Sequence, residues 1–336
     1  MCYIGLVQYY DKEASPMQSR QAQLVRASEL YYERGLSQQK IADILGVSRP
    51  TVSRLLEEAR KSGVVEIVVH APLKQNYELS ERLRRELGLK DAVVIRGEAS
   101  PDRSPALRRC AQAAGQLFLS LLESGMTVGL SWGRVLRQFC DTLPQQKHTF
   151  NVNVVQTIGC LGTGNPHLDG LELTLALAKK LNGTFYNVYA PVYVDSALVQ
   201  SYLLREPSVE LAIRQAGQAD IILTGIGSLT DNEGSLCRAG YFTPEERRSL
   251  VEAGAAAVIQ GRLLDRNGRE LAIPGRYVVG ASLEELHQVP WRIGINAGQD
   301  RAVETLASVR SGCVNLLVVD EPLALEVLKL NNSIGR

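Results

Sequence analysis

The hydrophobic and polar positions divide the chain into two regions with different periodicities. From Ser19 to Lys61 apolar residues recur at helical spacing, whereas from Asp91 onward short apolar runs alternate with amphipathic stretches. Helical spacing gathers apolar side chains on one face of a helix, and a short continuous apolar run bounded by turns is typical of a buried strand. The pattern therefore predicts a small helical domain followed by a larger α/β domain.

The tightest helical pattern in the first region predicts two short helices on either side of Gly46. Ser37 and Ser48 are good N-cap residues for the two helices, and Pro50 falls in the first turn of the second, where a missing N–H costs little. The expected apolar faces are formed by Ile41, Ala42, Ile44 and Leu45 in the first helix and by Val52, Leu55, Leu56 and Ala59 in the second. Two such helices joined at a glycine turn form a helix-turn-helix.

The opposite face of the second helix begins with hydroxyl and guanidinium groups, which can read base edges in the major groove of DNA. A helix-turn-helix presents the N-terminal end of this helix to the groove. The alternative interpretation is a helical hairpin whose polar face only meets water. We expect the base contacts to come from Arg49, Thr51, Ser53 and Arg54 and the phosphate contacts from Gln38, Gln39 and Lys40.

Three further segments complete the N-terminal third of the chain. A first helix is predicted over 19–34, and its expected inward side chains are Leu24, Ala27, Leu30 and Tyr31. The run at 64–69 reads as a strand and could form one side of a wing beside the DNA. The helix at 76–87 is either an ordinary amphipathic surface helix or one that pairs with its copy in another subunit. The expected domains are a helix-turn-helix domain at 17–70, a linker helix at 71–90 and a larger domain at 91–332.

The second region alternates between strand and helix patterns, which predicts a mostly parallel sheet covered by helices on both faces. An Asn-Gly pair inside 264–270 predicts one antiparallel hairpin. The predicted strands are 92–95, 127–130, 152–158, 184–189, 221–226, 255–259, 277–279, 292–295 and 314–319. The predicted helices are 105–123, 134–143, 170–181, 197–204, 209–216, 244–253, 283–288, 301–310 and 322–330.

Composition adds few constraints. A chain of 336 residues with 45% hydrophobic and 22% charged residues is ordinary for globular domains and long enough for two of them. The net charge is +1, but it is unevenly distributed. Residues 17–63 hold 8 basic and 5 acidic residues, and the rest of the chain holds 29 basic and 31 acidic residues. Local basicity this modest favours specific docking on nucleic acid over a polycationic tail.

The cysteines and the ends of the chain point to a cytoplasmic protein. The six cysteines are scattered without a C-x-x-C pair, so neither a disulfide framework nor a zinc site is predicted, and a reducing cytosol is the simple interpretation. No apolar run approaches the ~20 residues of a membrane span. Residues 1–16 carry an apolar patch without a cleavage site and are expected to be a loosely held arm or the product of an early start codon.

Four glycine-rich loops follow predicted strands, at 129–135, 159–165, 225–228 and 298–301. In open α/β sheets, ligands bind beyond the carboxyl ends of the strands. Ser131 and Gly133 sit at a predicted helix start, where backbone N–H groups favour an anion. Arg134 and Arg301 lie beside two of the loops. The loops therefore predict a phosphate or sugar pocket, although each alone could be a tight strand-to-helix connection.

Catalytic patterns are weaker. The four histidines stand in unrelated contexts, and Gly-Leu-Ser-Trp-Gly at 129–133 only superficially resembles the G-x-S-x-G nucleophile elbow. No lysine occurs in the four loops, so imine chemistry lacks a nucleophile there. Neither catalysis nor a cofactor is predicted.

The ordered set of motifs resembles the SorC family of bacterial sugar-responsive transcription regulators, over roughly residues 21–330. The motifs are the helix-turn-helix at 37–61, Gly-Leu-Ser-Trp-Gly at 129–133, Val-Gln-Thr-Ile-Gly-Cys-Leu-Gly at 155–162, Ala-Asp-Ile-Ile-Leu-Thr-Gly-Ile-Gly at 219–227, Gly-Arg-Leu-Leu-Asp-Arg-Asn-Gly at 261–268 and Val-Asn-Leu-Leu-Val-Val-Asp-Glu at 314–321. The resemblance implies a Rossmann-like effector domain similar to sugar-phosphate isomerase and deaminase folds, which binds sugars or sugar phosphates without turning them over. It also implies dimers or tetramers that bind double-stranded operator DNA near a carbohydrate operon.

The chain departs from the family pattern at three places. Val258 stands where many relatives have an aspartate, Arg134-Val135 replaces hydroxyl residues after Trp-Gly, and Arg301 replaces a lysine. Our hypothesis for the ligand places its anionic end at Ser131, Gly133, Arg134 and Arg301, its hydroxyls at Gln156, Thr163, Asn165 and Asp195, and Arg262 as a weaker anion contact. The alternative is a sugar-phosphate isomerase or deaminase that carries a DNA-binding domain.

Overall fold

The computed structural model describes residues 16–65, 73–147, 149–162, 165–230 and 234–334. The chain divides into two compact units, with the boundary between Pro72 and Leu73. Each unit has its own hydrophobic core. Among the helices within the described residues, none combines the length and the apolar character that crossing a membrane requires.

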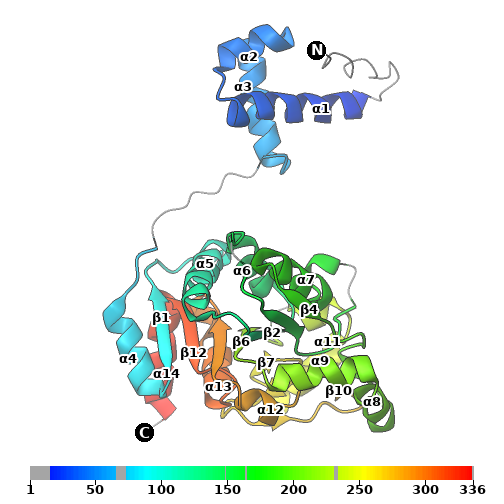
Figure 1. Ribbon diagram of the computed structural model, residues 1–336. Helices are drawn as coiled ribbons and strands as arrows, with labels where there is room; N and C mark the ends of the chain where they lie inside the picture. Colours follow the sequence, from blue (N-terminus) through cyan, green and yellow to red (C-terminus); the bar gives the residue numbers. More distant parts are fainter. Residues whose placement is uncertain (1–15, 66–72, 148, 163–164, 231–233, 335–336) are drawn as a thin grey trace. The chain divides into compact units, whose positions relative to one another are not determined.

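The N-terminal unit is a bundle of short helices (Figure 1). Its elements are α1 (Pro16–Ser28), the π-helical turn η1 (Glu29–Glu33), α2 (Gln38–Leu45) and α3 (Arg49–Lys61). The buried apolar side chains are Leu24, Ala27, Leu30, Ile41, Ala42, Val52, Leu55, Leu56 and Ala59. Nine of the twelve predicted inward positions are therefore buried, Leu45 is half-buried, and two are exposed.

The two exceptions are Tyr31 and Ile44, both predicted to face the core and both exposed, Ile44 by 54%. The wider π turn explains Tyr31, because an i→i−5 hydrogen bond from Arg34 to Glu29 adds a residue to the turn and rotates the following side chains. α2 has only two turns, and its narrow buried stripe is formed by Ile41 and Ala42. Ile44 lies outside this stripe.

The turn between α2 and α3 has the predicted local chemistry. The Ser37 hydroxyl accepts the N–H of Lys40, and the Ser48 hydroxyl accepts the N–H of Thr51. Gly46 adopts φ 66°, the left-handed conformation that ends α2. The strand expected at 64–69 falls mostly outside the described residues; Val64 and Val65 form a bend that packs against the helical core.

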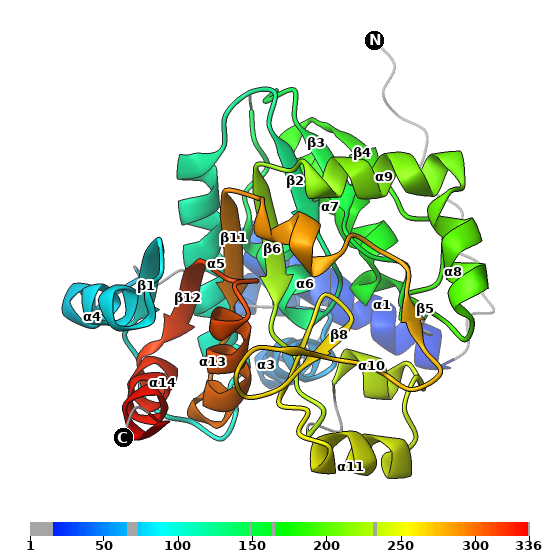
Figure 2. The same ribbon diagram turned by 90° about the horizontal axis from the view of Figure 1, so that it is seen from below.

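The C-terminal unit is built on a sheet whose neighbouring strands all run parallel. Figure 2 shows the strands side by side. In spatial order they are β1 (Asp91–Ile95), β12 (Leu316–Asp320), β11 (Trp291–Ile295), β6 (Ile221–Gly225), β2 (Thr127–Leu130), β3 (Asn153–Gln156) and β4 (Thr184–Tyr186). The predicted parallel sheet is therefore confirmed.

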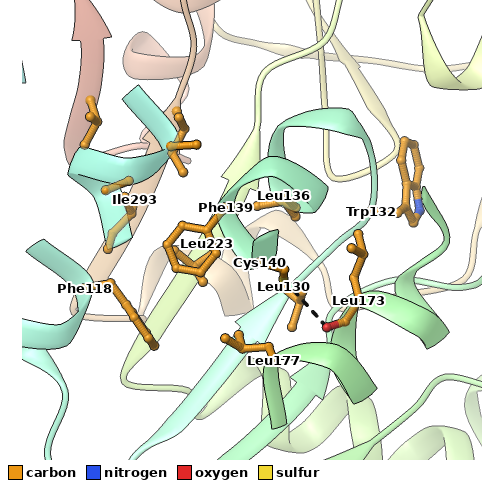
Figure 3. Close-up of a cluster of buried hydrophobic side chains, with 14 of the residues drawn as sticks. Phe118, Leu130, Trp132, Leu136, Phe139, Cys140, Leu173, Leu177, Leu223 and Ile293 are labelled. Carbon is orange, nitrogen blue, oxygen red and sulfur yellow. Dashed lines mark hydrogen bonds between the residues drawn. The ribbon is translucent and has the colours of Figure 1, made fainter. Parts of the chain in front are cut away.

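Helices cover both faces of this sheet. On one face lie α5 (Ser104–Leu121), α6 (Arg134–Thr142) and α7 (Gly170–Leu181). On the other lie α4 (Tyr77–Leu87), α9 (Pro207–Gly217), α12 (Leu283–His287), α13 (Ala302–Arg310) and α14 (Glu321–Ile334). Figure 3 shows the first core, where Phe118 and Phe139 meet edge to face with ring centroids 5.5 Å apart. This contact ties α5 to α6 above Leu130 of β2 and Leu223 of β6.

Two predicted strands do not join the main sheet. β7 (Ala257–Ile259) pairs antiparallel with β8 (Arg262–Leu264), which pairs with β9 (Glu270–Leu271), and β10 (Tyr277–Val278) pairs with β5 (Tyr193–Val194). The Asn-Gly hairpin is present between β8 and β9. The remaining short elements are α8 (Ala197–Leu204), α10 (Ser235–Arg238), α11 (Pro244–Glu252), η2 (Pro166–Leu168) and η3 (Gln299–Arg301).

The helix expected in a separate linker at 71–90 belongs instead to the C-terminal unit. α4 packs on β1 and runs beside α14, with Leu79 and Leu83 buried. Its N-cap, Asn76, donates a hydrogen bond from Nδ2 to Glu321 at the start of α14, 3.0 Å away. The stripe of leucines therefore covers the edge of the sheet, as expected for an amphipathic surface helix.

Candidate functional site

The first candidate surface is the start of α3. Arg49, Ser53 and Arg54 are exposed there, and Thr51 is half-buried. The Thr51 hydroxyl lies 2.8 Å from the Ser48 hydroxyl, so it already takes part in the cap of the helix. Four buried side chains fix the opposite face of α3 against the core, Val52, Leu55, Leu56 and Ala59. The polar positions predicted for base contacts thus share the solvent-facing side of one rigid helix.

The phosphate-contacting residues predicted on α2 lie in its first turn. Gln39 and Lys40 are exposed and Gln38 is half-buried. The Gln39 amide donates to Asp43 at 3.1 Å, one turn further along the helix. The unpaired N–H groups of a first helical turn favour an anion.

The second candidate site is a cavity of about 150 Å³ in the C-terminal unit. It lies at the carboxyl ends of the neighbouring strands β2 and β6, where the strand order reverses. From β2 the chain continues through α6 to β3 on one side, and from β6 it continues to β11 on the other side. Such a switch point, at the carboxyl ends of parallel strands, is where open α/β sheets bind ligands. The polar side chains that line the cavity belong to Arg103, Ser104, Ser131, Trp132, Arg134, Gln138, Ser228, Ser235, Gln260, Asn296 and Arg301.

The electrostatics of the cavity favour an anion. The N-terminal ends of α5 and α6 open onto it, and η3 brings Arg301 to it just before α13. Three guanidinium groups line the cavity, while the lining residues that the structure describes include no carboxylate. Arg301 is 8% exposed and forms ion pairs with Asp300 and Glu304, at 3.2 and 3.5 Å. These carboxylates offset its positive charge, so its main contribution to the cavity is its N–H donors.

Glycines shape the rim of the cavity. Gly133 has φ 116°, and a Cβ added there would lie 3.4 Å from the Ser235 hydroxyl. Gly298 has φ 93°, and its N–H is held by the Asp320 carboxylate at 3.0 Å. Burial raises the pKa of Asp320, and the N–H groups that it accepts oppose this. Gly133 lies in the wall of the cavity, whereas Gly298 is not one of its lining residues and directly precedes η3, which brings Arg301 to it.

Four of the nine residues predicted to contact a ligand line this cavity. They are Ser131, Gly133, Arg134 and Arg301. The loop at 159–162 faces away, because the N–H groups of Gly159 and Cys160 bond to Val279 and Ala190. Only Ile158, just before this loop, reaches the cavity.

Three of the other predicted contacts, Gln156, Asn165 and Arg262, have partners elsewhere in the unit. Gln156 is fully buried, and its Oε1 accepts the N–H of Val188 at 3.1 Å. Asn165 caps η2, and Asp195 is exposed. Arg262 pairs with Glu270 at 3.3 Å, and burial lowers the pKa of its guanidinium. Thr163 lies outside the described residues. The side chains of Gln156, Asn165, Asp195 and Arg262 are not among those that line this cavity, so their assignment as ligand contacts stays a prediction that the cavity does not support.

Sequence reasoning missed several lining residues. Arg103 precedes α5 and has no glycine-rich motif beside it, and Gln138 lies a full turn inside α6. Gln260 reaches the cavity from the β7–β8 hairpin, which two hydrogen bonds of 2.9 Å between Gly227 and Val258 attach to the loop after β6. The pair Gln260-Gly261 between two apolar runs could have predicted this hairpin, because a glycine in a two-residue turn is typical of tight β-hairpins.

Comparisons with known proteins agree with this architecture. Residues 71–329 match the model of a sugar-binding domain family, and residues 19–73 match a Crp-like helix-turn-helix domain. The chain is 28% identical to the sorbitol operon regulator of Klebsiella pneumoniae over 91% of this chain and 97% of that protein. It is 30% identical to the deoxyribonucleoside regulator of Bacillus subtilis over 89% of this chain and 95% of that protein.

A solved structure shows the same fold over both units. The full-length sorbitol operon regulator SorC from Klebsiella pneumoniae superposes with a TM-score of 0.69 at 28% identity, covering 92% of this chain and 99% of that one. The family match spans more than half of the chain, and the relatives are named transcriptional regulators. The chain therefore belongs to the SorC family of transcription regulators, with an N-terminal helix-turn-helix domain and a C-terminal sugar-binding domain.

Proposed function

We propose that this regulator binds operator DNA through the start of α3 and that a small sugar phosphate in the cavity at the β2–β6 switch point controls its operator affinity. The observation that carries the proposal is the cavity itself, lined by three guanidinium groups and by the N-terminal ends of α5 and α6, in a chain that also holds a helix-turn-helix. The names of the relatives, regulators of sorbitol and deoxyribonucleoside operons, support a carbohydrate effector.

For the DNA, the proposal assigns base contacts to Arg49, Thr51, Ser53 and Arg54 and phosphate contacts to Gln38, Gln39 and Lys40. A recognition helix enters the major groove with its N-terminal residues against the bases, and α3 exposes Arg49, Ser53 and Arg54 at that end. Arginine contacts guanine through two parallel hydrogen bonds, which makes Arg49 and Arg54 the strongest sources of sequence preference.

For the effector, size and charge both favour a sugar phosphate. A volume of about 150 Å³ is below the roughly 300–1,000 Å³ of sites for drug-sized ligands. It suits a small metabolite and is too small for a dinucleotide. Helix N-termini and guanidinium groups bind phosphate oxygens, and the serines and amides of the lining can bind hydroxyls. We therefore assign the anionic end to Ser131, Gly133 and Arg134, with Arg103 and Arg301 beside it.

Binding without turnover is the expected chemistry. An isomerase or deaminase needs a general acid or base whose pKa lies near neutrality. The described residues that line the cavity are arginines, serines, amides, glycines and apolar side chains, so neither a histidine nor a carboxylate is among them to serve as the acid or base. Val258, in the position where relatives have an aspartate, is one of the apolar lining residues. We infer a regulator that acts on DNA in the cytoplasm as a homo-oligomer.

A thermal-shift screen of the full-length protein tests the effector assignment. The compounds are ribose 5-phosphate, fructose 6-phosphate, the free sugars and inorganic phosphate. We expect a sugar phosphate to raise Tm in the wild type and not in Arg134→Ala. Arg137→Ala is the matched control, because Arg137 lies on the same helix, pairs with Asp141 at 2.8 Å and does not line the cavity. Equal shifts in the wild type and Arg134→Ala would place the anion elsewhere.

A further inference from the structure

The turn between β7 and β8 has an unusual residue at its first central position. Ile259 pairs with Arg262, so Gln260 and Gly261 alone form the turn, with φ of 49° and 70°. Positive φ at both central positions defines a type I′ turn, in which Asn, Asp or Gly is strongly preferred. A glutamine there is held in a strained backbone conformation, and such strain is concentrated at functional sites.

The surrounding structure fixes this turn from both sides. The Tyr193 hydroxyl donates to the carbonyl of Gly261, and Arg262 donates from Nη1 to the carbonyl of Gln260 at 3.0 Å. Tyr193 and Arg262 are both buried. The backbone of Gln260 is therefore rigid, and its side chain projects from a fixed point.

The side chain of Gln260 is 4% exposed, lines the cavity and has one hydrogen bond. Its Oε1 lies 2.7 Å from the Thr157 hydroxyl, which donates to it, while Nε2 is buried without a partner. Burying an amide N–H without a hydrogen bond is unfavourable. Thr157 orients the amide, so Nε2 remains as an unpaired donor on a side chain that lines the cavity.

We propose that Gln260 is a specificity-determining residue of the effector site, whose Nε2 donates to an uncharged oxygen of the sugar, a hydroxyl or a carbonyl. The proposal rests on the sugar-phosphate function proposed above. Gln260 comes from a different element than the anion-binding groups, because Ser131, Gly133 and Arg134 follow β2 while Gln260 follows β7. An effector that satisfies both must carry an anionic end and a neutral oxygen acceptor.

Thr157 is a positioning residue in this account. It follows β3, is fully buried and holds the Gln260 amide without lining the cavity itself. Removing its hydroxyl would free the amide to rotate. The effect on binding should be smaller than that of changing Gln260 and should vanish when Gln260 is already changed.

Isothermal titration of the full-length protein tests the proposal, with ribose 5-phosphate, fructose 6-phosphate and inorganic phosphate as probes. The variants are Gln260→Glu, Gln260→Met, Thr157→Val and Arg134→Ala. Gln260→Glu keeps an acceptor for Thr157 but replaces the donor by a carboxylate oxygen and adds a negative charge, whereas Gln260→Met removes the donor without adding charge. We expect both variants to weaken sugar-phosphate binding by about 10- to 100-fold, and we expect Gln260→Met to leave inorganic phosphate binding unchanged. Arg134→Ala should weaken both kinds of probe.

Protonation provides a second readout. Lowering the pH should restore part of the affinity of Gln260→Glu, because a neutral carboxyl group can donate, and should not restore that of Gln260→Met. Far-UV circular dichroism and Tm show that each variant is folded; if Gln260→Glu is not, Gln260→Met and Thr157→Val still test the donor. Sugar-phosphate binding by folded Gln260 variants as tight as wild type would overturn the proposal, as would Gln260→Glu binding well while Gln260→Met does not. Failure of every probe to bind the wild type would overturn the proposed function, and this inference with it.

Discussion

At the scale of single residues, the solvent-facing start of α3 is the surface that we propose to read the operator sequence. Arg49 and Arg54 are exposed on this helix, while Val52, Leu55 and Leu56 hold its other face in the core. Guanidinium groups on a rigid helix can make paired hydrogen bonds to guanine, and a single good pair contributes about 1–3 kcal/mol of discrimination. The same helix ends in Lys61, which pairs with Glu57 at 2.7 Å.

We expect Arg49→Ala and Arg54→Ala each to reduce the preference for operator over scrambled DNA by about 1–3 kcal/mol. Lys61→Ala is the control, because it removes a charge from the far end of the same helix and should leave the preference intact. Fluorescence anisotropy with both DNAs at one salt concentration measures the ratio of affinities. An unchanged ratio in both arginine variants would remove these residues from the interface.

His287 makes stability depend on pH. Burial, and then the positive charge of Arg292, lower the pKa of its imidazole from the usual 6.5. The folded protein thus favours neutral His287, and this contribution is present above the unfolded pKa and is lost as pH falls through the folded one. We expect the wild type to lose more stability than His287→Gln between about pH 7 and pH 5. Urea unfolding followed by tryptophan fluorescence measures this, and parallel pH profiles would contradict it.

Some site residues could be found from sequence and others could not, for a physical reason. Ser131, Gly133 and Arg134 stand together after one strand, so a local pattern reveals them. Gln260 and Arg103 approach the same cavity from distant segments, and their meeting depends on how the hairpin docks on the loop after β6. Gln156 and Arg262 were predicted as ligand contacts because they are polar residues beside glycine-rich segments, but they lie at the ends of β3 and β8, where they are buried and have partners within the unit.

At the scale of elements, the apolar runs predicted where the strands lie but not which sheet each strand joins. The strands of the main sheet were predicted within a few residues, because most are short, largely apolar runs of the kind that a doubly covered sheet buries; the edge strand β4, with Thr184 and Phe185 exposed, is the exception. β7 has the same composition and instead forms a hairpin with β8, since the two-residue turn at Gln260 forces antiparallel pairing. α4 was predicted as a helix and its docking was not, because an amphipathic stripe does not specify its partner.

The turn of the helix-turn-helix depends on Gly46. Its φ is 66°, and a Cβ added there would meet no atom within 4 Å, so the cost of a side chain is purely conformational. We expect Gly46→Ala to destabilise α2 and α3 by about 1 kcal/mol, and Gly46→Asn to cost less because asparagine tolerates this conformation. Hydrogen exchange of the α2 and α3 amides in the full-length protein measures the local change. Equal protection in Gly46→Ala and the wild type would refute it.

At the scale of the whole molecule, we propose that the effector unit controls the DNA-binding unit through the assembly of subunits. A symmetric operator is read by two-fold related helices, and a single helix-turn-helix buries too little surface for tight specific binding. We expect a dimer or tetramer in sedimentation velocity at about micromolar concentration. A monomer that still binds its operator specifically would contradict this expectation. α4 and exposed parts of the effector unit are the candidate contacts.

The central claim is that the cavity at the β2–β6 switch point controls DNA binding. Its most direct test is the operator affinity of the full-length protein, measured by anisotropy with and without the sugar phosphate that raises its Tm. We predict a 5- to 150-fold change for the wild type and Arg137→Ala, which corresponds to a coupling free energy of about 1–3 kcal/mol, and no change for Arg134→Ala. An operator affinity that stays constant while the sugar phosphate saturates the wild-type cavity would contradict the account.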